Sequence, residues 1–469
     1  MQARFARCVR GLRSVSTFQR GPHDPYNALT RRFKPSAEKK GPLAGWEVSI
    51  KENISMKDVA TTCSSRMLQE YRAPYNAAVV DRLEASGALI TSRNNCDEFA
   101  MGGLNVHSVY GPVANPAIYE DVRNPDFTKH EPRAPGGSSG GAAAAVAGEL
   151  CRVALGTDTG GSVRLPGSFC GVYGFKPSYG LISRWGVVSY ADSLDTVGIF
   201  ARDVKDVAAV LDVIAGDDAR DATCVDNTMR MQIAELTDAR ISEIGVPGKP
   251  LHGLRVGVPA EMYPAELDER VAYIADDVLE ALQSLGATIV PLRIPAMEQS
   301  ISAYYVLALA EASSNLGRFD GMRYGLSVPD QGTFHETIAA ARAEGFGDEV
   351  QKRILLGTYA VTTEAWDSFY MSAIAARFAL VQQLAAQWSG LDLRMTRTQN
   401  ENGVDIMVHP TSLRGAPRLS DNPAAEYAQD VLTTWANLVG APVLSAPAAQ
   451  MLEDTDGARL PIGIGAGTM

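Results

Sequence analysis

The sequence predicts an α/β fold in one large domain. Short apolar segments with the length of buried strands alternate with segments whose apolar residues recur at helical spacing, which is typical of α/β proteins. Of the 469 residues, 46% are hydrophobic and 21% are charged, so the chain has the composition of a folded protein and can bury a large core. We find no boundary between independent domains.

In the first half of the chain, the alternating elements lead to two clusters of glycine and serine. The apolar segment before Lys51 has the length of a buried strand, and Val80 and Leu83 recur at helical spacing. The predicted elements are a strand at 45–50, a helix at 77–88, a strand at 88–91, a surface loop with four prolines at 114–135, a helix at 142–150 and a strand at 151–155.

The second half of the chain continues the alternation and then becomes mainly helical. The predicted elements are a helix at 204–215, a strand at 254–258, a helix at 271–285, a strand at 288–290, several helices within 300–388 and a short strand at 404–408 inside a loop at 400–421. Residues 227–250 are polar and show no core pattern. We therefore expect them to form an excursion or a link between parts of the domain.

Composition excludes several classes of function. The net charge is −11, which is the wrong sign for a chain that grips a phosphate backbone unaided. The six cysteines contain no CxxC pair and the six histidines no HExxH pair, so we expect neither a disulfide framework nor a metal site. No run reaches the roughly 20 apolar residues that a membrane-spanning helix requires.

The first 20 residues differ from the rest of the chain. They carry five arginines and no acidic residue, and Phe5, Val9 and Leu12 would form an apolar stripe on a helix. This pattern is typical of a mitochondrial presequence, and a disordered basic tail is the alternative. We therefore expect residues 1–20 to be a presequence and residues 21–469 to form the folded domain.

The two glycine and serine clusters are the most informative feature of the sequence. Residues 136–141 read GGSSGG and residues 156–162 read GTDTGGS, on either side of the helix and strand predicted at 142–155. Glycines let the backbone approach a ligand closely, and successive free amides can form an oxyanion hole. The GxxxxGK[ST] and GxGxxG patterns of nucleotide-binding loops are absent, and flexible linkers are seldom embedded between buried elements.

A serine nucleophile in these clusters would need a base. The sequence has no GxSxG elbow, but Lys51 stands at the end of an apolar strand. Burial there would lower the pKa of its amine and make the neutral form available. A solvated strand end is the alternative for a lone lysine.

Four segments resemble the amidase signature family. They are GPLAGWEVSIKENI (41–54), NNCDEFAMGG (94–103), PGGSSGGAAAAVA (135–147) and GTDTGGSVRLPGSFCGVYGFKPSYG (156–180). The resemblance covers the chain from about residue 27 to its end. It implies a single α/β domain whose mixed central β-sheet is covered by helices on both faces. The family normally continues beyond the sequence LPIGIGAGTM, so we expect a C-terminus shorter than usual.

The resemblance also implies a Ser-Ser-Lys triad. Ser162 would be the nucleophile, Ser138 the bridging serine after an unusual cis peptide, and Lys51 the base; an exchange of roles between Ser138 and Ser139 stays open. The oxyanion would be held by amides around Thr159, Gly160, Gly161 and Ser162. Asp158 and Arg164 are expected to hold the loop by hydrogen bonds rather than transfer protons.

Residues 344–362 and 426–447 resemble the glutaminase subunits of tRNA-dependent amidotransferases within this family. By that resemblance, Arg353 would pair with the α-carboxylate of glutamine and Asp430 with its α-ammonium, as charge complementarity favours. The alternatives are a helix-surface charge for Arg353 and a charge at a helix N-terminus for Asp430. The rival functions are a stand-alone amidase of other small amides and a non-catalytic scaffold.

The same resemblance implies partners. Ammonia would pass to the B subunit of the amidotransferase, which holds Glu-tRNA(Gln) and uses ATP and Mg, and a small accessory subunit would clamp the two. This chain would then need no cofactor and no metal, and it would meet tRNA only through its partner. Together with the presequence-like start, this predicts a protein of the mitochondrial matrix.

Overall fold

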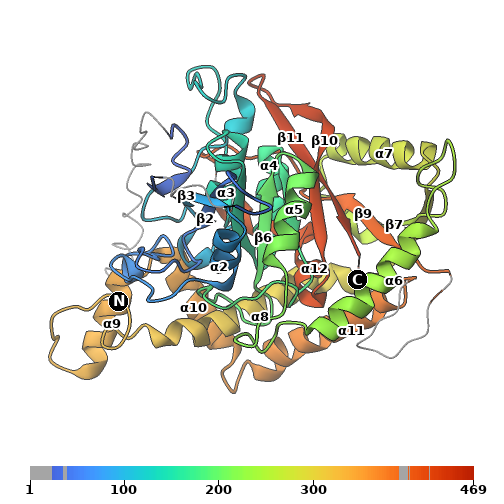
Figure 1. The fold of residues 1–469 in the computed structure, drawn as a ribbon. Coiled ribbons are helices and arrows are strands. Elements are labelled where there is room, and N and C mark those ends of the chain that lie inside the picture. Colours follow the sequence, from blue (N-terminus) through green and yellow to red (C-terminus); the bar gives the residue numbers. More distant parts are fainter. Residues whose placement is uncertain (1–23, 35–39, 390–399, 401, 422, 469) are drawn as a thin grey trace.

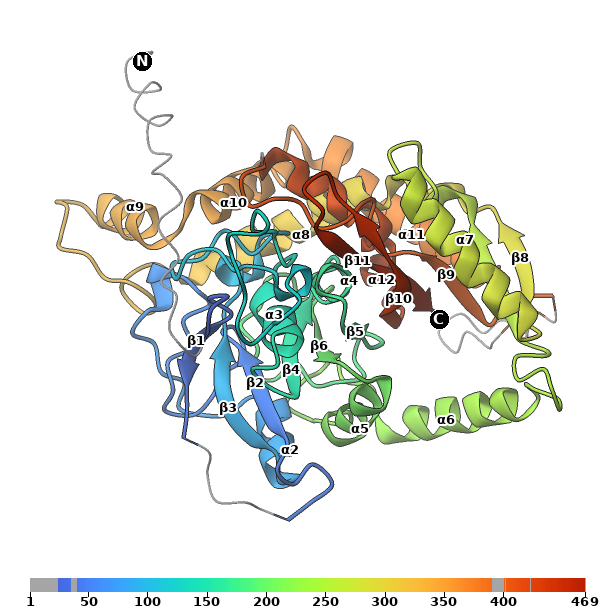
Figure 2. The same ribbon diagram turned by 90° about the horizontal axis from the view of Figure 1, so that it is seen from above.

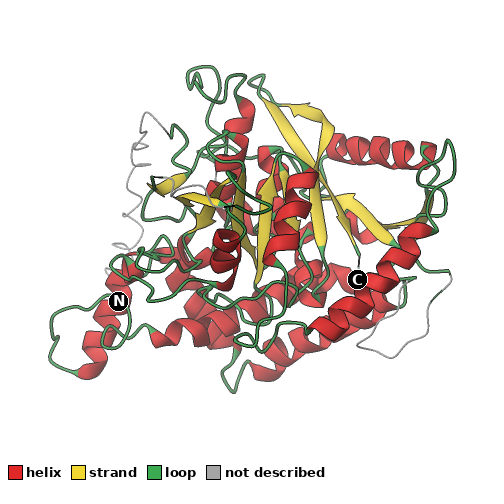
Figure 3. Cartoon of the chain, in the orientation of Figure 1, coloured by secondary structure: helices red, strands yellow, loops and turns green. Residues whose placement is uncertain are grey.

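The computed structural model describes residues 24–34, 40–389, 400, 402–421 and 423–468. The expected presequence at residues 1–20 lies outside these residues. The fold is an α/β domain around one mixed sheet of 11 strands (Figure 1; Figure 3), as the sequence and the family resemblance predict.

The strands have the spatial order β1-β3-β2-β4-β6-β5-β10-β11-β9-β7-β8. Their bounds are β1 (Leu29–Arg32), β2 (Glu47–Lys51), β3 (Leu89–Asn94), β4 (Val153–Asp158), β5 (Tyr173–Lys176), β6 (Thr196–Ala201), β7 (Arg255–Pro259), β8 (Thr288–Leu292), β9 (Ile406–Pro410), β10 (Val443–Glu453) and β11 (Arg459–Gly467). The pairs β2–β3, β2–β4, β7–β8 and β7–β9 are parallel, and the other pairs are antiparallel.

The helices lie on both faces of the sheet. Their bounds are α2 (Ala78–Ala85), α3 (Gly140–Ala147), α4 (Arg164–Cys170), α5 (Val204–Ile214), α6 (Asn227–Ser242), α7 (Glu269–Ser284), α8 (Ser300–Asn315), α9 (Phe334–Gly345), α10 (Asp348–Ala360), α11 (Ser372–Ala385), α12 (Thr434–Val439) and the 3₁₀ segment η9 (Pro423–Leu432). Figure 2 shows α2 and α5 on the side of the sheet opposite to α8, α10 and α11.

Side chains that alternate along the strands explain why both faces are covered. In β4, Val153 and Leu155 join a core cluster with α2 and α5, whereas Ala154 joins a cluster with α3 and α7. In β9, Met407 packs with α8, α11 and α12, whereas Val408 packs on the other side. Each strand therefore buries successive residues in different layers of the core.

Three expectations need correction. β4 continues to Asp158, beyond the predicted end at residue 155, because β6 pairs with all six of its residues. Residues 227–250, expected as a polar excursion or a link between parts of the domain, contain the 16-residue helix α6, none of whose residues is buried. The proline-rich segment 114–135 is buried at both ends, where the buried Arg133 forms ion pairs with two aspartates of the β10–β11 turn.

No helix in the described part of the chain is long and apolar enough to cross a membrane. The described residues also contain no group of three or more His, Cys, Asp or Glu side chains that could hold a metal ion.

Candidate active site

The Lys51 amine lies in the interior, at the end of β2. The residue is fully buried, and Nζ donates to Ser138 Oγ at 2.8 Å, Ser139 Oγ at 2.7 Å and Thr157 Oγ1 at 3.0 Å. Burial lowers the pKa of Lys51 below its ordinary value of 10.5, since removal from water disfavours the charged ammonium. The structure therefore favours the neutral amine that a lysine base requires.

The two serines beside Lys51 differ in where their protons can go. Ser139 Oγ donates to the carbonyl oxygen of Thr157 at 3.0 Å, so its proton is already committed. Ser138 follows a cis peptide bond, and Lys51 is the partner of its hydroxyl among the described residues. A neutral amine has two N–H groups and one lone pair. If the N–H groups are directed to Ser139 and Thr157, the lone pair is left for the proton of Ser138, which favours Ser138 as the bridging serine.

Ser162 follows the second glycine cluster and is the least buried member of the candidate triad. It is 8% exposed, whereas Lys51 and Ser138 are fully buried. Its carbonyl oxygen accepts from the amide of Ser139 at 3.2 Å, which joins the two serine-bearing loops. Within the described residues, Ser162 Oγ makes no hydrogen bond and is not yet bonded to Ser138.

Asp158 and Arg164 hold the loop that carries Ser162. Asp158 accepts from the amides of Gly161 and Val163 at 3.0 and 3.1 Å, and Arg164 donates to both of its carboxylate oxygens. Although burial alone would raise the pKa of Asp158, the guanidinium of Arg164 holds it at about 2. The pair is fully charged and hydrogen-bonded, in agreement with the expected loop-holding role.

The two glycines before Ser162 are required by space. A Cβ at Gly160 would lie 2.3 Å from the ring of Tyr304, and one at Gly161 would lie 2.3 Å from Thr433 Oγ1. Gly161 also has φ +146°, which favours glycine. Tyr304 on α8 and Thr433 at the start of α12 therefore pack directly against this loop.

The amides of this loop are not equally free. The N–H of Gly161 is taken by Asp158, so it is already bonded within the loop. The amides of Thr159, Gly160 and Ser162 donate no hydrogen bond to another described residue. Of the expected oxyanion donors, Thr159, Gly160 and Ser162 thus keep free amides, whereas Gly161 contributes its conformation.

The structure brings Arg353 and Asp430 to the same place. Arg353 on α10 is 3% exposed, so it is not a helix-surface charge; its guanidinium lies 5.9 Å from the ring centre of Tyr305. Tyr305 OH donates to Asp430 Oδ2 at 2.6 Å. Thr433 bonds both the carbonyl oxygen of Asp430 and, at 2.6 Å, that of Gly160. The oppositely charged pair therefore adjoins the loop that carries Ser162.

Several residues at this site were not predicted from the sequence. Glu349, one helical turn before Arg353, forms an ion pair with it at 2.7 Å, and Tyr427 OH donates to the same carboxylate. Tyr190 OH accepts from Arg353 Nη1 at 3.1 Å. The i, i+4 spacing of Glu349 and Arg353 was a usable signal. Nothing in the local sequence marks the tyrosines.

A cavity of about 1320 Å³ opens beside this site. Its lining includes Tyr71, Trp185, Ser189, Asp195 and Arg318, but none of the triad residues. It adjoins the triad loop at Asp195, whose carboxylate accepts from Thr159 Oγ1 at 2.7 Å. The cavity is thus a neighbour of the candidate active site and not the site itself.

Comparison with known protein families identifies the family of this chain. The chain belongs to the Amidase family, whose family model matches residues 14–467, and it has the fold of an amidase-type enzyme.

Among its relatives, the chain is similar to the A subunit of the mitochondrial glutamyl-tRNA(Gln) amidotransferase of Mycosarcoma maydis, with 44% identity over 460 residues that cover 93% of this chain and 85% of that protein. It is similar to the A subunit of the glutamyl-tRNA(Gln) amidotransferase of Deinococcus radiodurans, with 40% identity over 98% of this chain and 87% of that protein. The crystal structure of the corresponding A subunit from Thermotoga maritima superimposes with a TM-score of 0.72 and 33% identity, over 95% of this chain and 84% of that one.

Proposed function

We propose that this chain is the glutaminase subunit of a glutamyl-tRNA(Gln) amidotransferase. The observation that carries this proposal is that Arg353 and Asp430 both lie at Tyr305, next to the Ser162 loop: the guanidinium is 5.9 Å from the ring centre, and the carboxylate accepts from the hydroxyl. A guanidinium suits an α-carboxylate and a carboxylate suits an α-ammonium, so an amino acid amide fits this place better than a lipid amide, whose pocket would be mainly apolar. The similarity to the A subunits of two such amidotransferases supports glutamine as that amide.

The proposed reaction begins with proton transfer. Neutral Lys51 takes the proton of Ser138 while Ser138 takes that of Ser162, and Ser162 Oγ attacks the carboxamide carbon of glutamine. The free amides of Thr159, Gly160 and Ser162 stabilise the resulting oxyanion. The C–N bond then breaks, and the proton held by Lys51 returns through Ser138 to the leaving nitrogen, which departs as ammonia.

The second half of the reaction releases the acyl group. Water gives a proton to the same Lys51–Ser138 relay and attacks the acyl ester on Ser162. The ester bond breaks and Ser162 recovers its proton, so one glutamine and one water yield glutamate and ammonia. No step requires a metal or a cofactor in this chain.

The proposal extends to partners and place of action. The ammonia passes to the B subunit of the amidotransferase, which holds Glu-tRNA(Gln) and activates it with ATP and Mg, and a small accessory subunit clamps the two together. The net charge of −11 supports an assignment of tRNA binding to the partner. The basic start of the chain and the similarity to a mitochondrial relative support residues 1–20 as a presequence, residues 21–469 as the amidase domain, and action in the mitochondrial matrix.

Ammonia release tests the proposal directly. We would measure ammonia from glutamine with the chain alone and with the chain co-expressed with the B subunit, with Ser162→Ala as the matched control. Glutamine hydrolysis that vanishes in the variant is the expected result. A folded complex that leaves glutamine untouched but cleaves other amides would instead identify a general amidase, and a complex inactive on every amide would identify a scaffold.

A further inference from the structure

The turn before β6 lies between the Ser162 loop and Arg353. It is closed by Asp195, which is buried and accepts from the amides of Tyr190 and Ala191 at 2.8 and 3.1 Å. The other oxygen of the same carboxylate accepts from Thr159 Oγ1 at 2.7 Å. One side chain thus holds both the turn and the first residue of the candidate oxyanion loop.

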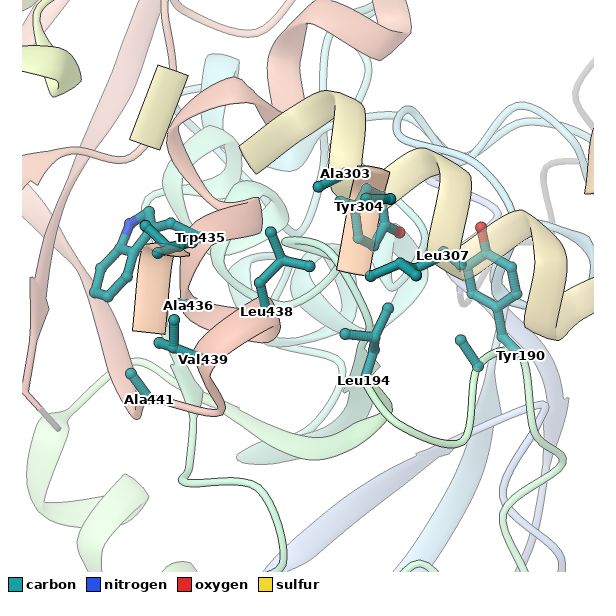
Figure 4. Close-up of a cluster of buried hydrophobic side chains, with 14 of the residues drawn as sticks. Tyr190, Leu194, Ala303, Tyr304, Leu307, Trp435, Ala436, Leu438, Val439 and Ala441 are labelled. Atoms are coloured by element: carbon teal, nitrogen blue, oxygen red, sulfur yellow. The ribbon is translucent and has the colours of Figure 1, made fainter. Parts of the chain in front are cut away.

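The other end of this connection reaches Arg353. Tyr190 is buried, and its hydroxyl accepts from Arg353 Nη1 at 3.1 Å. Figure 4 shows the Tyr190 ring lying next to α8, with its hydroxyl directed toward that helix, in a cluster that also holds Leu194 and Leu307. Because close packing leaves the ring little freedom, a shift of Arg353 would also displace the Tyr190 backbone. That backbone is bonded to Asp195.

The hydrogen bonds of Asp195 are suited to holding the turn before β6 against the loop that carries Thr159. Its hydrogen-bond donors in the described residues are two hydroxyls and two amides, and no arginine or lysine pairs with it there. A buried carboxylate without a paired cation is costly, so it is retained only where its bonds are numerous and short. Bonds to a charged acceptor are also stronger than neutral ones, which fixes the two segments relative to each other.

We propose that Asp195 is a positioning residue that couples occupancy of Arg353 to the alignment of Thr159 in the oxyanion loop. This inference rests on the proposed glutaminase function. Binding of the α-carboxylate at Arg353 is transmitted through Tyr190 and Asp195 to Thr159. The α-carboxylate of the substrate therefore raises kcat and does not merely lower KM. As a result, the enzyme selects glutamine over amides without this group more strongly than it would by binding affinity alone.

The test compares two substrates in the complex with the B subunit. Glutamine is set against 4-aminobutanamide, which keeps the amine and the carboxamide but lacks the α-carboxylate. With Asp195→Asn, kcat for glutamine is expected to fall by roughly 10- to 100-fold, as for other losses of alignment. The kcat for 4-aminobutanamide, already low, should stay within about threefold, the usual context-dependent scatter of a point mutation outside the reacting atoms.

Substitutions of Thr159, which donates to Asp195, distinguish the proposed coupling from a general loss of structure. Thr159→Val should reproduce the glutamine-selective loss, the double variant with Asp195→Asn should cost no more than either alone, and Thr159→Ser should restore the rate because it keeps the hydroxyl. Asp212→Asn is the matched control, since Asp212 is an exposed aspartate on α5, outside this turn. It should leave the ratio of the two substrates unchanged.

The outcomes are distinguishable. Equal losses on both substrates, or additive effects of the Thr159 and Asp195 substitutions, would overturn the coupling while leaving the glutaminase proposal intact. A wild-type complex that releases no ammonia from glutamine would overturn the proposed function and the coupling with it. If Asp195→Asn fails to fold, the Thr159→Val and Thr159→Ser pair decides the question by itself.

Discussion

Lys176 at the end of β5 predicts a measurable dependence of stability on pH. The residue is fully buried, and its amine donates to the carbonyl oxygen of Pro177 at 2.9 Å. Burial, reinforced by the nearby charge of Arg164, lowers its pKa from 10.5 to about 7. Between these two values the unfolded chain holds a proton that the folded chain has released, so this group makes the protein more stable as pH rises.

The magnitude follows from the two pKa values. One pKa unit corresponds to about 1.4 kcal/mol, and near pH 7 the folded amine is half protonated, so the contribution of Lys176 should rise by about 2 kcal/mol between pH 7 and pH 9. Below pH 7 both states hold the proton and the dependence disappears. Lys176→Met occupies similar space without a charge, so its free energy of unfolding should lack this rise.

Urea unfolding, followed by tryptophan fluorescence at pH 7 and pH 9, measures the effect. The difference between the wild type and Lys176→Met isolates this group, since every other titrating residue is common to both. Lys205→Met, at an exposed position on α5, is the matched control and should follow the wild type. Parallel pH dependences for the wild type and Lys176→Met would refute the reasoning.

Three further predictions concern the site. Ser138→Ala should lower the rate of ammonia release from glutamine by roughly 10²- to 10⁴-fold, as loss of a proton relay does, whereas Ser139→Ala should lose much less; equal losses would contradict the proton assignment. Gly161→Ala should reduce the free energy of unfolding by at least about 1 kcal/mol and abolish activity, because its Cβ would meet Thr433. Thermal unfolding and the ammonia assay measure the two effects, and a variant as stable and as active as the wild type would argue against this. Because burial lowers the pKa of Lys51, kcat/KM should fall as pH drops through that lowered value; a limb that begins only near 10.5 would exclude a buried base.

Sequence patterns predicted β2, β3, β4, β7, β8 and β9 at least in part, but not β1, β5, β6, β10 and β11. Strand β6 was missed although it is apolar and buried along its whole length. The strand ending at Lys51 was found because it is short, apolar and followed by a helical pattern. Strands β10 and β11 were missed because proline interrupts the first and glycine alternates through the second, so neither shows the usual strand composition. Helix α6 was missed because it buries no residue, and a helix without a buried stripe leaves no core pattern.

In the candidate site, too, some residues could be proposed from the sequence and others are revealed only by the structure. Ser162, Lys51 and the loop-holding role of Asp158 could be proposed from the sequence, because their motifs lie in continuous stretches. Ser138 was preferred by family resemblance, and the hydrogen bond from Ser139 Oγ to the Thr157 carbonyl oxygen adds support for that choice. The connection through Tyr190 joins segments far apart in the chain, and distances of that kind are set by tertiary packing that no local pattern records.

The clamp around Asp158 also has a consequence for the order in which the protein becomes active during synthesis. Arg164 donates to the carbonyl oxygen of Thr433 and to Asn437, which lie 269 and 273 residues further along the chain. A ribosome therefore makes Ser162, the proposed nucleophile, long before it makes the groups that complete the loop. Nascent chains that end before Asn437 lack part of the clamp, so the loop that carries Ser162 is completed only after most of the domain has been synthesised.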